Sequence, residues 1–369
     1  MKIVFLCPVV SHVRYHKRIN ALKNLGANTK VLAFEREYYS GKSLSEGYVS
    51  LGEISHGNYF KRIIPFIKSF SKIRSMIKNA DIVYAFGLDN LLLGWLANST
   101  VKNNSKIIYE VGDIRGILLK NSFSAKLLRE LEKFLLNHIN LLVVTSKAYI
   151  SGYYEGILNM DNIKYQVIEN KLNKDEFQSL KSSGSCISKE TLKIGYFGVL
   201  RCQRSWNILK KVAEKSNGRI QIYLRGIPMG IKNFKNEVSK ISNVNYGGPY
   251  KAPDDLFQIY NQVDIVWACY PYQDKQIGNW LWARTNRFYE SCLFNKPMLT
   301  LAGNQDAKVV NKFKIGKSLD LSNIKATVKE VLNLDKSRIK QWEKNLYNLP
   351  EKLYLYTNEH KKLFEFLNK

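Results

Sequence analysis

Short apolar runs alternate with helix-length stretches along almost the whole chain, and this order limits the fold more than any other feature. The runs are continuous rather than alternately polar, as in KIVFLCPV at residues 2–9 and NLLVVTS at 140–146. Strands that are apolar on both faces are typical of parallel sheets covered by helices on both sides. The repeated order of strand and helix therefore predicts an α/β fold with parallel sheets.

The strand–helix order restarts after a polar break, KSSGSCISKE, at residues 181–190. A chain of 369 residues is long for one core and comfortable for two domains. We therefore expect two Rossmann-like domains, at 1–175 and 190–335, with a helical segment at 336–369 that packs back towards the first. The predicted strands lie at 2–9, 29–34, 47–54, 81–87, 106–112, 140–146, 165–170, 192–200, 219–226, 243–248, 264–270, 296–303 and 316–321. The main predicted helices lie at 12–25, 59–79, 88–101 and 121–138.

Open parallel sheets bind ligands beyond the carboxyl ends of their strands, at the point where the strand order reverses. Two such domains are expected to face a cleft, each with one ligand. This architecture suits the transfer of a group between two substrates.

Lysine and arginine outnumber aspartate and glutamate by 57 to 31, which gives a formal net charge of +26. An imbalance of this size implies an anionic partner, such as nucleic acid, an acidic membrane surface or a phosphate-bearing substrate. A codon bias towards Lys, Asn and Ile is the alternative source of the charge.

No apolar run approaches the roughly 18–20 residues that cross a bilayer. The start, MKIVFLCPVV, resembles a signal peptide only superficially and is interpreted as the first strand. The five cysteines are scattered without a CxxC pair, which favours reduced thiols over a metal site or disulfides. We expect a cytoplasmic protein.

The second half carries a pattern that indicates a nucleotide-binding site. LKIGYFGVL at 192–200 is interpreted as a buried strand that enters a tight glycine turn at Gly198, and Arg201 and Arg204 follow as a helix begins. Some ninety residues later Glu290 lies on a helix that leads into another strand. A glycine turn brings backbone amides to a phosphate, arginines neutralise it, and a carboxylate can accept from both hydroxyls of a ribose. The alternatives are solvated cations at a helix start and a surface glutamate paired with Arg287 or Lys296.

Taken together, the motifs resemble the GT-B glycosyltransferases, most closely the retaining enzymes of family four found in bacterial capsule, O-antigen and exopolysaccharide gene clusters. The resemblance covers nearly the whole chain. It rests on the order and spacing of HVRYHKRINALKNLGANTKVLAF, ADIVYAFGLDNLLLGWLA, KIIYEVGDIRG, KIGYFGVLR, PDDLFQIYNQVDIVWACY and NRFYESCLFNKPML.

The resemblance implies that the C-terminal domain binds a nucleotide-sugar donor. Glu290 would hold the ribose, and Gly198 would approach the diphosphate. Arg201, as a catalytic residue, and Arg204 would stabilise the leaving nucleoside diphosphate. Arg225 and Arg287 are further donor-site candidates, although Arg225 fits a plain strand-ending turn equally well.

One position departs from the family pattern. The family often has a second glutamate eight positions before the ribose-binding one, and here that position is Trp282. Gln276, Gly278 and Asn279 are the expected substitutes that contact the sugar. Trp280 or Trp282 could stack on a sugar face, and a core position is the alternative for one of them.

For the N-terminal domain the resemblance implies acceptor binding. Asp113 ends a predicted strand and is a candidate acceptor contact or general base, and a turn-forming role is the alternative. The family often has a His-Asp pair here, and the histidine position is Gly112. Arg14 and His16 are candidate acceptor contacts, with a plain surface histidine as the alternative. No metal motif follows a strand; Asp254 and Asp255 are interpreted as helix-start acids, and no metal or other cofactor is expected.

Between Ile54 and Ala80 there are cations and no acidic residue. The basic segment 59–79 is predicted to be a helix whose apolar stripe faces its own sheet and whose cations attach the protein to the anionic inner face of the cytoplasmic membrane.

The main interpretation is a glycosyltransferase of the hexosyltransferase type that acts on a surface polysaccharide or lipid-linked glycan. A nucleotide-sugar epimerase of similar fold is the alternative enzyme. A nucleic-acid-binding protein or a non-catalytic member of the fold is the alternative from another class. No nucleic-acid-binding motif is visible, so no nucleic acid partner is expected.

Overall fold

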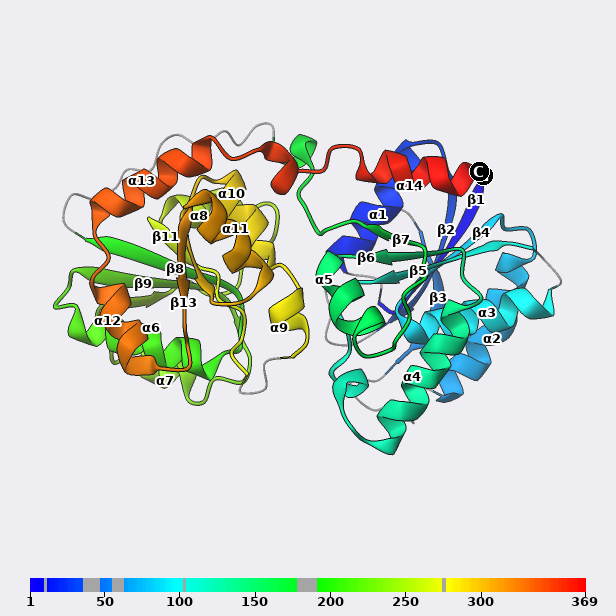
Figure 1. Cartoon of the computed structure of the whole chain (residues 1–369), viewed down its shortest axis with the longest axis horizontal. Coiled ribbons are helices and arrows are strands. Elements are labelled where there is room, and N and C mark those ends of the chain that lie inside the picture. Colours follow the sequence, from blue (N-terminus) through cyan, green and yellow to red (C-terminus); the bar gives the residue numbers. More distant parts are fainter. Residues whose placement is uncertain (10–11, 36–46, 55–62, 102–103, 178–190, 274–276) are drawn as a thin grey trace. The chain divides into compact units, whose positions relative to one another are not determined.

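The computed structural model describes residues 1–9, 12–35, 47–54, 63–101, 104–177, 191–273 and 277–369. The chain divides into two compact units. The first comprises Met1–Asn170 together with Thr357–Lys369, and the second comprises Lys171–Tyr356. The second unit is therefore an insertion in the sequence of the first (Figure 1).

The first unit contains a seven-stranded sheet in the order β3-β2-β1-β4-β5-β6-β7, and every described pairing in it is parallel. Its strands are β1 (Lys2–Cys7), β2 (Asn28–Glu35), β3 (Val49–Glu53), β4 (Ile82–Phe86), β5 (Lys106–Val111), β6 (Leu141–Val144) and β7 (Tyr165–Val167). Its helices are α1 (Val13–Asn24), α2 (Ile63–Ile77), α3 (Leu88–Thr100), η2 (Gly116–Leu119), α4 (Phe123–Leu136), α5 (Lys147–Tyr149), η3 (Ile150–Glu155) and α14 (Glu359–Asn368).

The second unit contains a six-stranded parallel sheet in the order β10-β9-β8-β11-β12-β13. Its strands are β8 (Leu192–Leu200), β9 (Ile220–Pro228), β10 (Val244–Tyr246), β11 (Ile265–Trp267), β12 (Met298–Leu301) and β13 (Gly316–Leu319). Its helices are η4 (Lys174–Phe177), α6 (Gln203–Lys215), α7 (Phe234–Val238), α8 (Leu256–Asn261), α9 (Asn279–Trp282), α10 (Asn286–Leu293), α11 (Gln305–Phe313), α12 (Ile324–Leu332), α13 (Lys336–Tyr347) and η5 (Glu351–Leu353).

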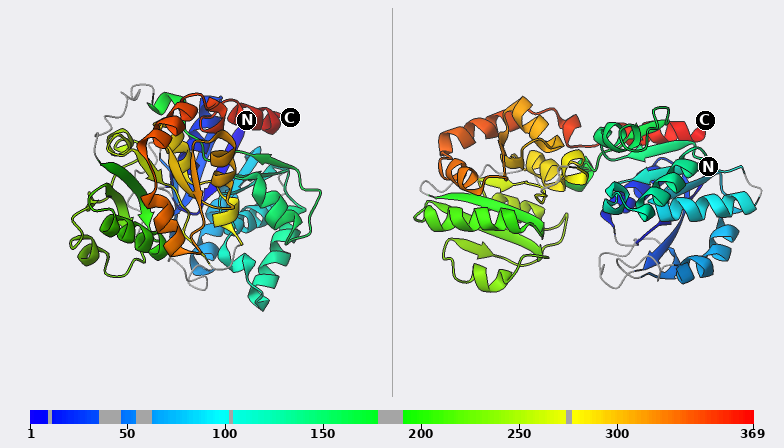
Figure 2. Two further views of the ribbon diagram at one scale, coloured as in Figure 1. Left: turned by 60° about the vertical axis from the view of Figure 1, so that its left-hand side comes forward. Right: turned by 60° about the horizontal axis from the view of Figure 1, so that its bottom comes forward.

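Helices cover both faces of the second sheet, which is why its strands are apolar on both sides. One buried cluster joins Ile194 and Tyr196 of β8 to apolar residues of α6, α7 and α12. The other joins Phe197 of the same strand to α8, α10 and α11. The two helix layers can be followed on the left of Figure 1 and again in Figure 2.

The strand predictions and the parallel α/β fold class are confirmed, because each predicted strand coincides with a described one to within a few residues. The chain passes from the first unit to the second at Asn170–Lys171, before the polar stretch at 181–190, and residues 178–190 are outside the described part. The C-terminal segment differs from expectation. Helix α13 counts with the second unit, and only the part from Thr357 onwards, with α14, counts with the first.

Helix α2 departs from the prediction made for its apolar stripe. Ile73 and Ile77 of the stripe are fully buried, as expected, but Ile67 of the same stripe is 70% exposed. Ile64, which lies outside the stripe, is 64% exposed. The residues before Ile63 in the predicted segment 59–79 are outside the described part. Within the described ranges, no helix is both long and apolar enough to span a bilayer.

Candidate active site

Each sheet has one point at which the chain reverses its direction of winding. In the second unit the reversal falls between β8 and β11, and in the first unit between β1 and β4. The carboxyl ends of these strands are the positions where open α/β sheets bind ligands. Most candidate residues lie at these two places, and each unit is described separately.

Gly198 lies inside β8 rather than in the expected tight turn, since the strand continues to Leu200 and α6 begins only at Gln203. Gly198 pairs with Gly226 of β9, and both have positive φ angles, of 100° and 131°. A Cβ atom on Gly226 would lie 1.8 Å from the carbonyl oxygen of Gly198. The two glycines therefore let the strands approach each other closely where a side chain would prevent it.

The two arginines after β8 differ in their surroundings. Arg201 is exposed, and its guanidinium lies 5.8 Å from the centre of the Tyr270 ring. Arg204 donates to the carbonyl oxygens of Leu321 and Ser322, at 3.1 and 3.0 Å, and its guanidinium lies over Tyr272. Arg204 thus ties the start of α6 to the loop before α12, whereas Arg201 faces solvent.

Arg287 joins the ends of the two strands at the reversal. It lies in the first turn of α10, where the hydroxyl of Thr285 caps the helix by accepting from the Phe288 amide at 3.2 Å. The Arg287 guanidinium donates to the carbonyl oxygens of Phe197 at 2.9 Å and Cys269 at 3.1 Å. Arg287 therefore holds α10 against the carboxyl ends of β8 and β11.

Glu290 lies one turn after Arg287 and is 8% exposed. Its carboxylate accepts a hydrogen bond from the Tyr260 hydroxyl at 2.7 Å. Burial and the nearby Glu290 raise the pKa of Tyr260 well above its ordinary value, so this hydroxyl stays protonated and donates. The alternative partner Lys296 is buried next to Asp264 and Glu343.

Sequence reasoning missed Tyr250, which lies between the glycines and the carboxylate. A Cβ atom on Gly198 would lie 3.9 Å from the Tyr250 hydroxyl, and burial and Glu290 raise the pKa of Tyr250. Arg225 holds the loop before it by donating to the carbonyl oxygens of Gly248 at 3.1 Å and Pro249 at 2.9 Å. Arg225 is thus placed to position Tyr250.

The short helix α9 contains the segment expected to contact the sugar. Gly278 precedes it with a φ of 111°, a conformation that favours glycine, and Asn279 is its first residue. Trp280 and Trp282 are buried to 2% and 7% exposure, and Trp280 belongs to the core beside α6. Gln276 is outside the described residues.

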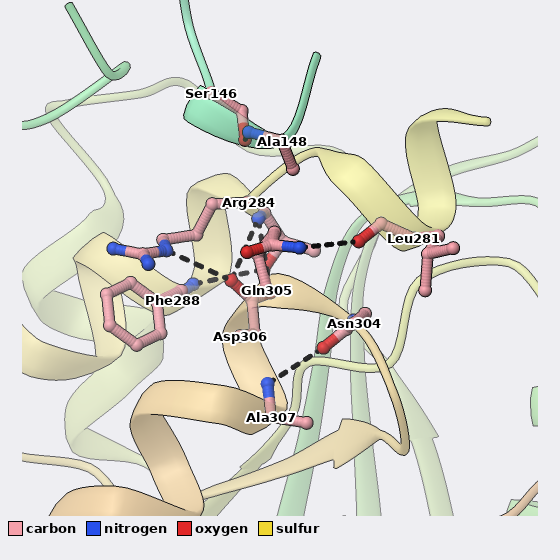
Figure 3. A network of polar contacts seen from close by, with 10 residues as sticks. Ser146, Ala148, Leu281, Arg284, Phe288, Asn304, Gln305, Asp306 and Ala307 are labelled. Atoms are coloured by element: carbon pink, nitrogen blue, oxygen red, sulfur yellow. Dashed lines mark hydrogen bonds and ion pairs between the residues drawn. The ribbon is translucent and has the colours of Figure 1, made fainter. Parts of the chain in front are cut away.

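A buried polar network, which the sequence did not reveal, fixes the turn between α9 and α10 (Figure 3). Asp306 of α11 is fully buried and accepts from the Thr285 amide at 3.1 and 3.3 Å, with the Arg284 guanidinium at 3.8 Å. Gln305 donates to the carbonyl oxygen of Leu281 at 3.2 Å. Burial raises the pKa of Asp306 to about 6, against the opposing effect of Arg284 and the Thr285 hydrogen bonds. Asp306 therefore supports the residue that caps the helix of Arg287 and Glu290.

The first unit contains a cavity of about 210 Å³ at the carboxyl ends of β1, β4 and β5. Arg14, Asp113 and Arg115 contribute to its wall. Arg115 makes two hydrogen bonds to Asp89, at 2.7 and 2.9 Å. His16 is not among the lining residues of this cavity, whereas His12 is.

Both Arg14 and Asp113 adjoin Gly112 in that wall, Arg14 through its guanidinium and Asp113 as the next residue in the chain. A Cβ atom on Gly112 would lie 1.7 Å from the central carbon of the Arg14 guanidinium, so only glycine leaves room for it. The side chain of His12 caps α1 by accepting from the Arg14 amide at 3.3 Å. Burial, with Arg14 and His16 nearby, lowers the pKa of His12 to about 3, and His12 is therefore neutral near pH 7.

The parts of the chain that the structure describes contain no group of three or more His, Cys, Asp or Glu side chains placed to hold a metal ion. Asp255 precedes α8, as the interpretation of the Asp254–Asp255 pair as helix-start acids requires.

The two units, each with a parallel sheet between helices, form the GT-B fold of glycosyltransferases. WaaG, a glycosyltransferase involved in lipopolysaccharide biosynthesis, aligns over 99% of both chains with a TM-score of 0.69 and 14% identity. Anabaena Alr3699/HepE, solved in complex with UDP, aligns over the whole of both chains with a TM-score of 0.73 and 15% identity.

A relative is also detected by sequence. The chain is 26% identical to the succinoglycan biosynthesis protein ExoL of Rhizobium meliloti (strain 1021) over 287 residues, which is 75% of this chain and 70% of ExoL. No protein-family model matches the chain.

Proposed function

We propose that the chain is a glycosyltransferase that moves a hexose from a nucleoside-diphosphate sugar to a surface-polysaccharide or lipid-linked glycan acceptor. The observation that carries this proposal is the placement of Glu290. It is a buried carboxylate on a helix that Arg287 holds against the carboxyl ends of β8 and β11. The fold, the similarity to ExoL and the UDP bound by HepE support the same function.

In this proposal the second unit binds the donor. Glu290 accepts from the ribose hydroxyls, and the backbone at Gly198 approaches the diphosphate. Arg201 is exposed and neutralises the charge that grows on the leaving diphosphate. Arg287 and Arg225 act as positioning residues, because carbonyl oxygens already occupy their guanidinium groups.

The first unit binds the acceptor, with Asp113 as the candidate contact to its hydroxyl. The bond from the sugar C1 to the diphosphate oxygen breaks while the bond from C1 to the acceptor oxygen forms. The acceptor proton passes to the leaving phosphate, which permits retention of configuration at C1. Since the Arg201 side chain serves the diphosphate in this scheme, we propose that transfer needs no divalent cation, and activity in EDTA tests that point.

We also propose that the first unit attaches to the anionic inner face of the cytoplasmic membrane. Helix α2 presents exposed Ile64 and Ile67 beside the exposed cations Lys68, Lys72 and Arg74. Apolar groups that enter the headgroup region and cations that pair with anionic lipids both contribute to the affinity for a membrane, and the two contributions add. Co-sedimentation with liposomes that does not depend on anionic lipid would contradict this attachment.

The experiment that tests the main proposal measures binding of UDP, GDP, dTDP and CMP, and of their common sugars, by thermal shift. We expect one nucleotide to stabilise the protein and Glu290→Ala to abolish that effect. Glu214→Ala removes an exposed carboxylate from α6 of the same unit and serves as the matched control. Failure of every nucleotide to stabilise the wild-type protein would overturn the donor site.

A further inference from the structure

The cavity of the first unit is small for a ligand site. Its volume of about 210 Å³ lies below the ~300–1,000 Å³ of pockets that hold drug-sized ligands. At ~30 Å³ per molecule of liquid water it has room for about seven waters. A single ring-sized group therefore fits it, and a longer glycan would have to extend outside.

Two carboxylates of the cavity wall are already hydrogen-bonded within the unit. Glu110 forms an ion pair with Arg18 at 2.9 Å and accepts from the Tyr84 hydroxyl. Glu132 accepts from the hydroxyls of Tyr109 at 2.9 Å and Tyr153 at 2.6 Å.

The Arg18 guanidinium balances the charge of Glu110. Burial raises the pKa of Glu132, and the hydrogen bonds from Tyr153 and Tyr109 oppose that rise. Arg115 is likewise matched by Asp89. These groups shape the cavity, and none of them adds an unmatched positive charge to it.

Arg14 and Asp113 are two further charged groups of the wall, and their charges are opposite. The Nε atom of Arg14 is buried and has no hydrogen-bond partner, while Asp113 is exposed. A guanidinium only donates hydrogen bonds, and an ionised carboxylate only accepts them. The wall thus offers both kinds of partner next to Gly112, and the charge of Arg14 is balanced by that of Asp113.

We propose that this cavity binds one uncharged sugar ring of the acceptor, with Arg14 donating to one of its hydroxyl oxygens and Asp113 accepting from a hydroxyl. The inference rests on the proposed function, in which the first unit holds the acceptor. An anionic group would be attracted to Arg14 and repelled by Asp113, so the two effects oppose each other. A hydroxyl pair satisfies both side chains. In this proposal the net positive charge of the chain does not take part in binding inside the cavity.

The direct test is ligand-observed NMR of the full chain with methyl glucoside, methyl galactoside, glucuronate and inorganic phosphate. We expect a neutral glycoside to bind at least tenfold more tightly than either anion, and Arg14→Gln to weaken that binding at least tenfold. Lys30→Gln removes a cation from an exposed site in β2 of the same unit and should leave the binding unchanged. Tighter binding of glucuronate or phosphate, or no binding of any glycoside, would overturn the inference.

A second variant pair tests the role of Gly112. Gly112→Ala places a methyl group where the Arg14 guanidinium lies and should weaken glycoside binding about as much as Arg14→Gln does. In the Arg14→Gln background the same change should have little further effect. Gly116→Ala, whose Cβ would meet nothing within 4 Å, is the matched control. Additive losses in the double variant would show that Gly112 does not act through Arg14.

A thermal-shift measurement with nucleotides distinguishes a failure of the sugar-site proposal from a failure of the proposed glycosyltransferase function. Nucleotide binding without glycoside binding would remove the sugar site and leave the donor site standing. Glycoside binding without nucleotide binding would remove the glycosyltransferase proposal and leave the cavity assignment standing.

Discussion

The buried carboxylates of the second unit have two different roles at the scale of single residues. Glu290 faces Tyr260 and belongs to the proposed donor site, whereas Asp306 faces the backbone amide of Thr285 and Arg284 and supports a helix start. A carboxylate that is already hydrogen-bonded on one side has less freedom to turn. We therefore expect Tyr260 and Asp306 to affect the donor by positioning other groups.

We expect Tyr260→Phe to weaken nucleotide binding about five- to tenfold. The change removes one hydrogen bond of about 1–1.5 kcal/mol to Glu290 while the ring keeps its packing against Phe197 and Phe294. Titration calorimetry with the nucleotide found in the screen measures this. Tyr347→Phe, at a ring that is 84% exposed, should bind as the wild type does. Equal loss in both variants would contradict the positioning role.

Asp306 should make the stability of the second unit depend on pH. Its pKa rises from 3.8 to about 6 in the folded state, so the folded state binds the proton more tightly. The stabilisation is complete below the unfolded pKa and is lost as the pH rises through about 6, a change of about 3 kcal/mol. The free energy of unfolding of the wild type relative to Asp306→Asn should therefore fall between pH 4 and pH 7. Urea titrations across that range measure it, and a constant difference would contradict the assignment.

At this scale the sequence could identify residue types within motifs but not their partners. Glu290 and Gly198 follow from a pattern of neighbouring residues. Tyr250, Tyr260 and Asp306 reach the same site through contacts between residues far apart in the chain, which no local pattern contains. Arg204 was expected to bind the diphosphate and Arg287 was a donor-site candidate, but in the structure their guanidinium groups donate to main-chain carbonyl oxygens.

At the scale of elements, the sequence predicted strands better than it predicted how they end. Continuous apolar runs define buried parallel strands because both faces must be covered. A glycine after such a run is typical of a turn, and the sequence analysis placed one at Gly198. The turn does not form because Gly198 pairs with Gly226 and both strands continue past the two glycines. The pairing joins distant parts of the chain and is invisible to local reasoning.

Gly226→Ala should therefore disrupt this strand pair. The new Cβ would lie 1.8 Å from the carbonyl oxygen of Gly198, and the φ of 131° is unfavourable for alanine. Gly218→Ala has a positive φ of 82° without any neighbour within 4 Å and should cost only about 1 kcal/mol. We expect Gly226→Ala to cost at least about 2 kcal/mol more, measured by chemical denaturation. Equal costs would show that the strands can separate freely.

At the scale of the whole molecule, the sequence predicted two sheets and a C-terminal segment that packs back towards the first domain, but not the residue at which the chain returns. The return was expected from 336 onwards, and only Thr357–Lys369 belongs to the first unit. In the structure α14 lies beside α1, and Gln166 and Lys106 of the first unit donate to the carbonyl oxygens of Glu359 and Leu367 (Figure 1).

Helix α14 should therefore stabilise the first unit. Leu363 is fully buried, and Leu363→Ala should lower the free energy of unfolding by about 2–4 kcal/mol. Hydrogen exchange should increase in α1 and leave the sheet of the second unit unchanged. Leu127→Ala, at a side chain that is 63% exposed, is the matched control. Faster exchange confined to the second unit would contradict this assignment.

The insertion of one unit into the other also bears on how the chain is made. Domains generally fold in the order in which the ribosome releases them. The first sheet is translated first, but the surface of α1 that α14 covers stays open until the segment after Thr357 has been released. The second unit can fold before that moment. The unit whose synthesis begins first is therefore the last to complete its fold. During translation it is exposed to aggregation for longer than the second unit.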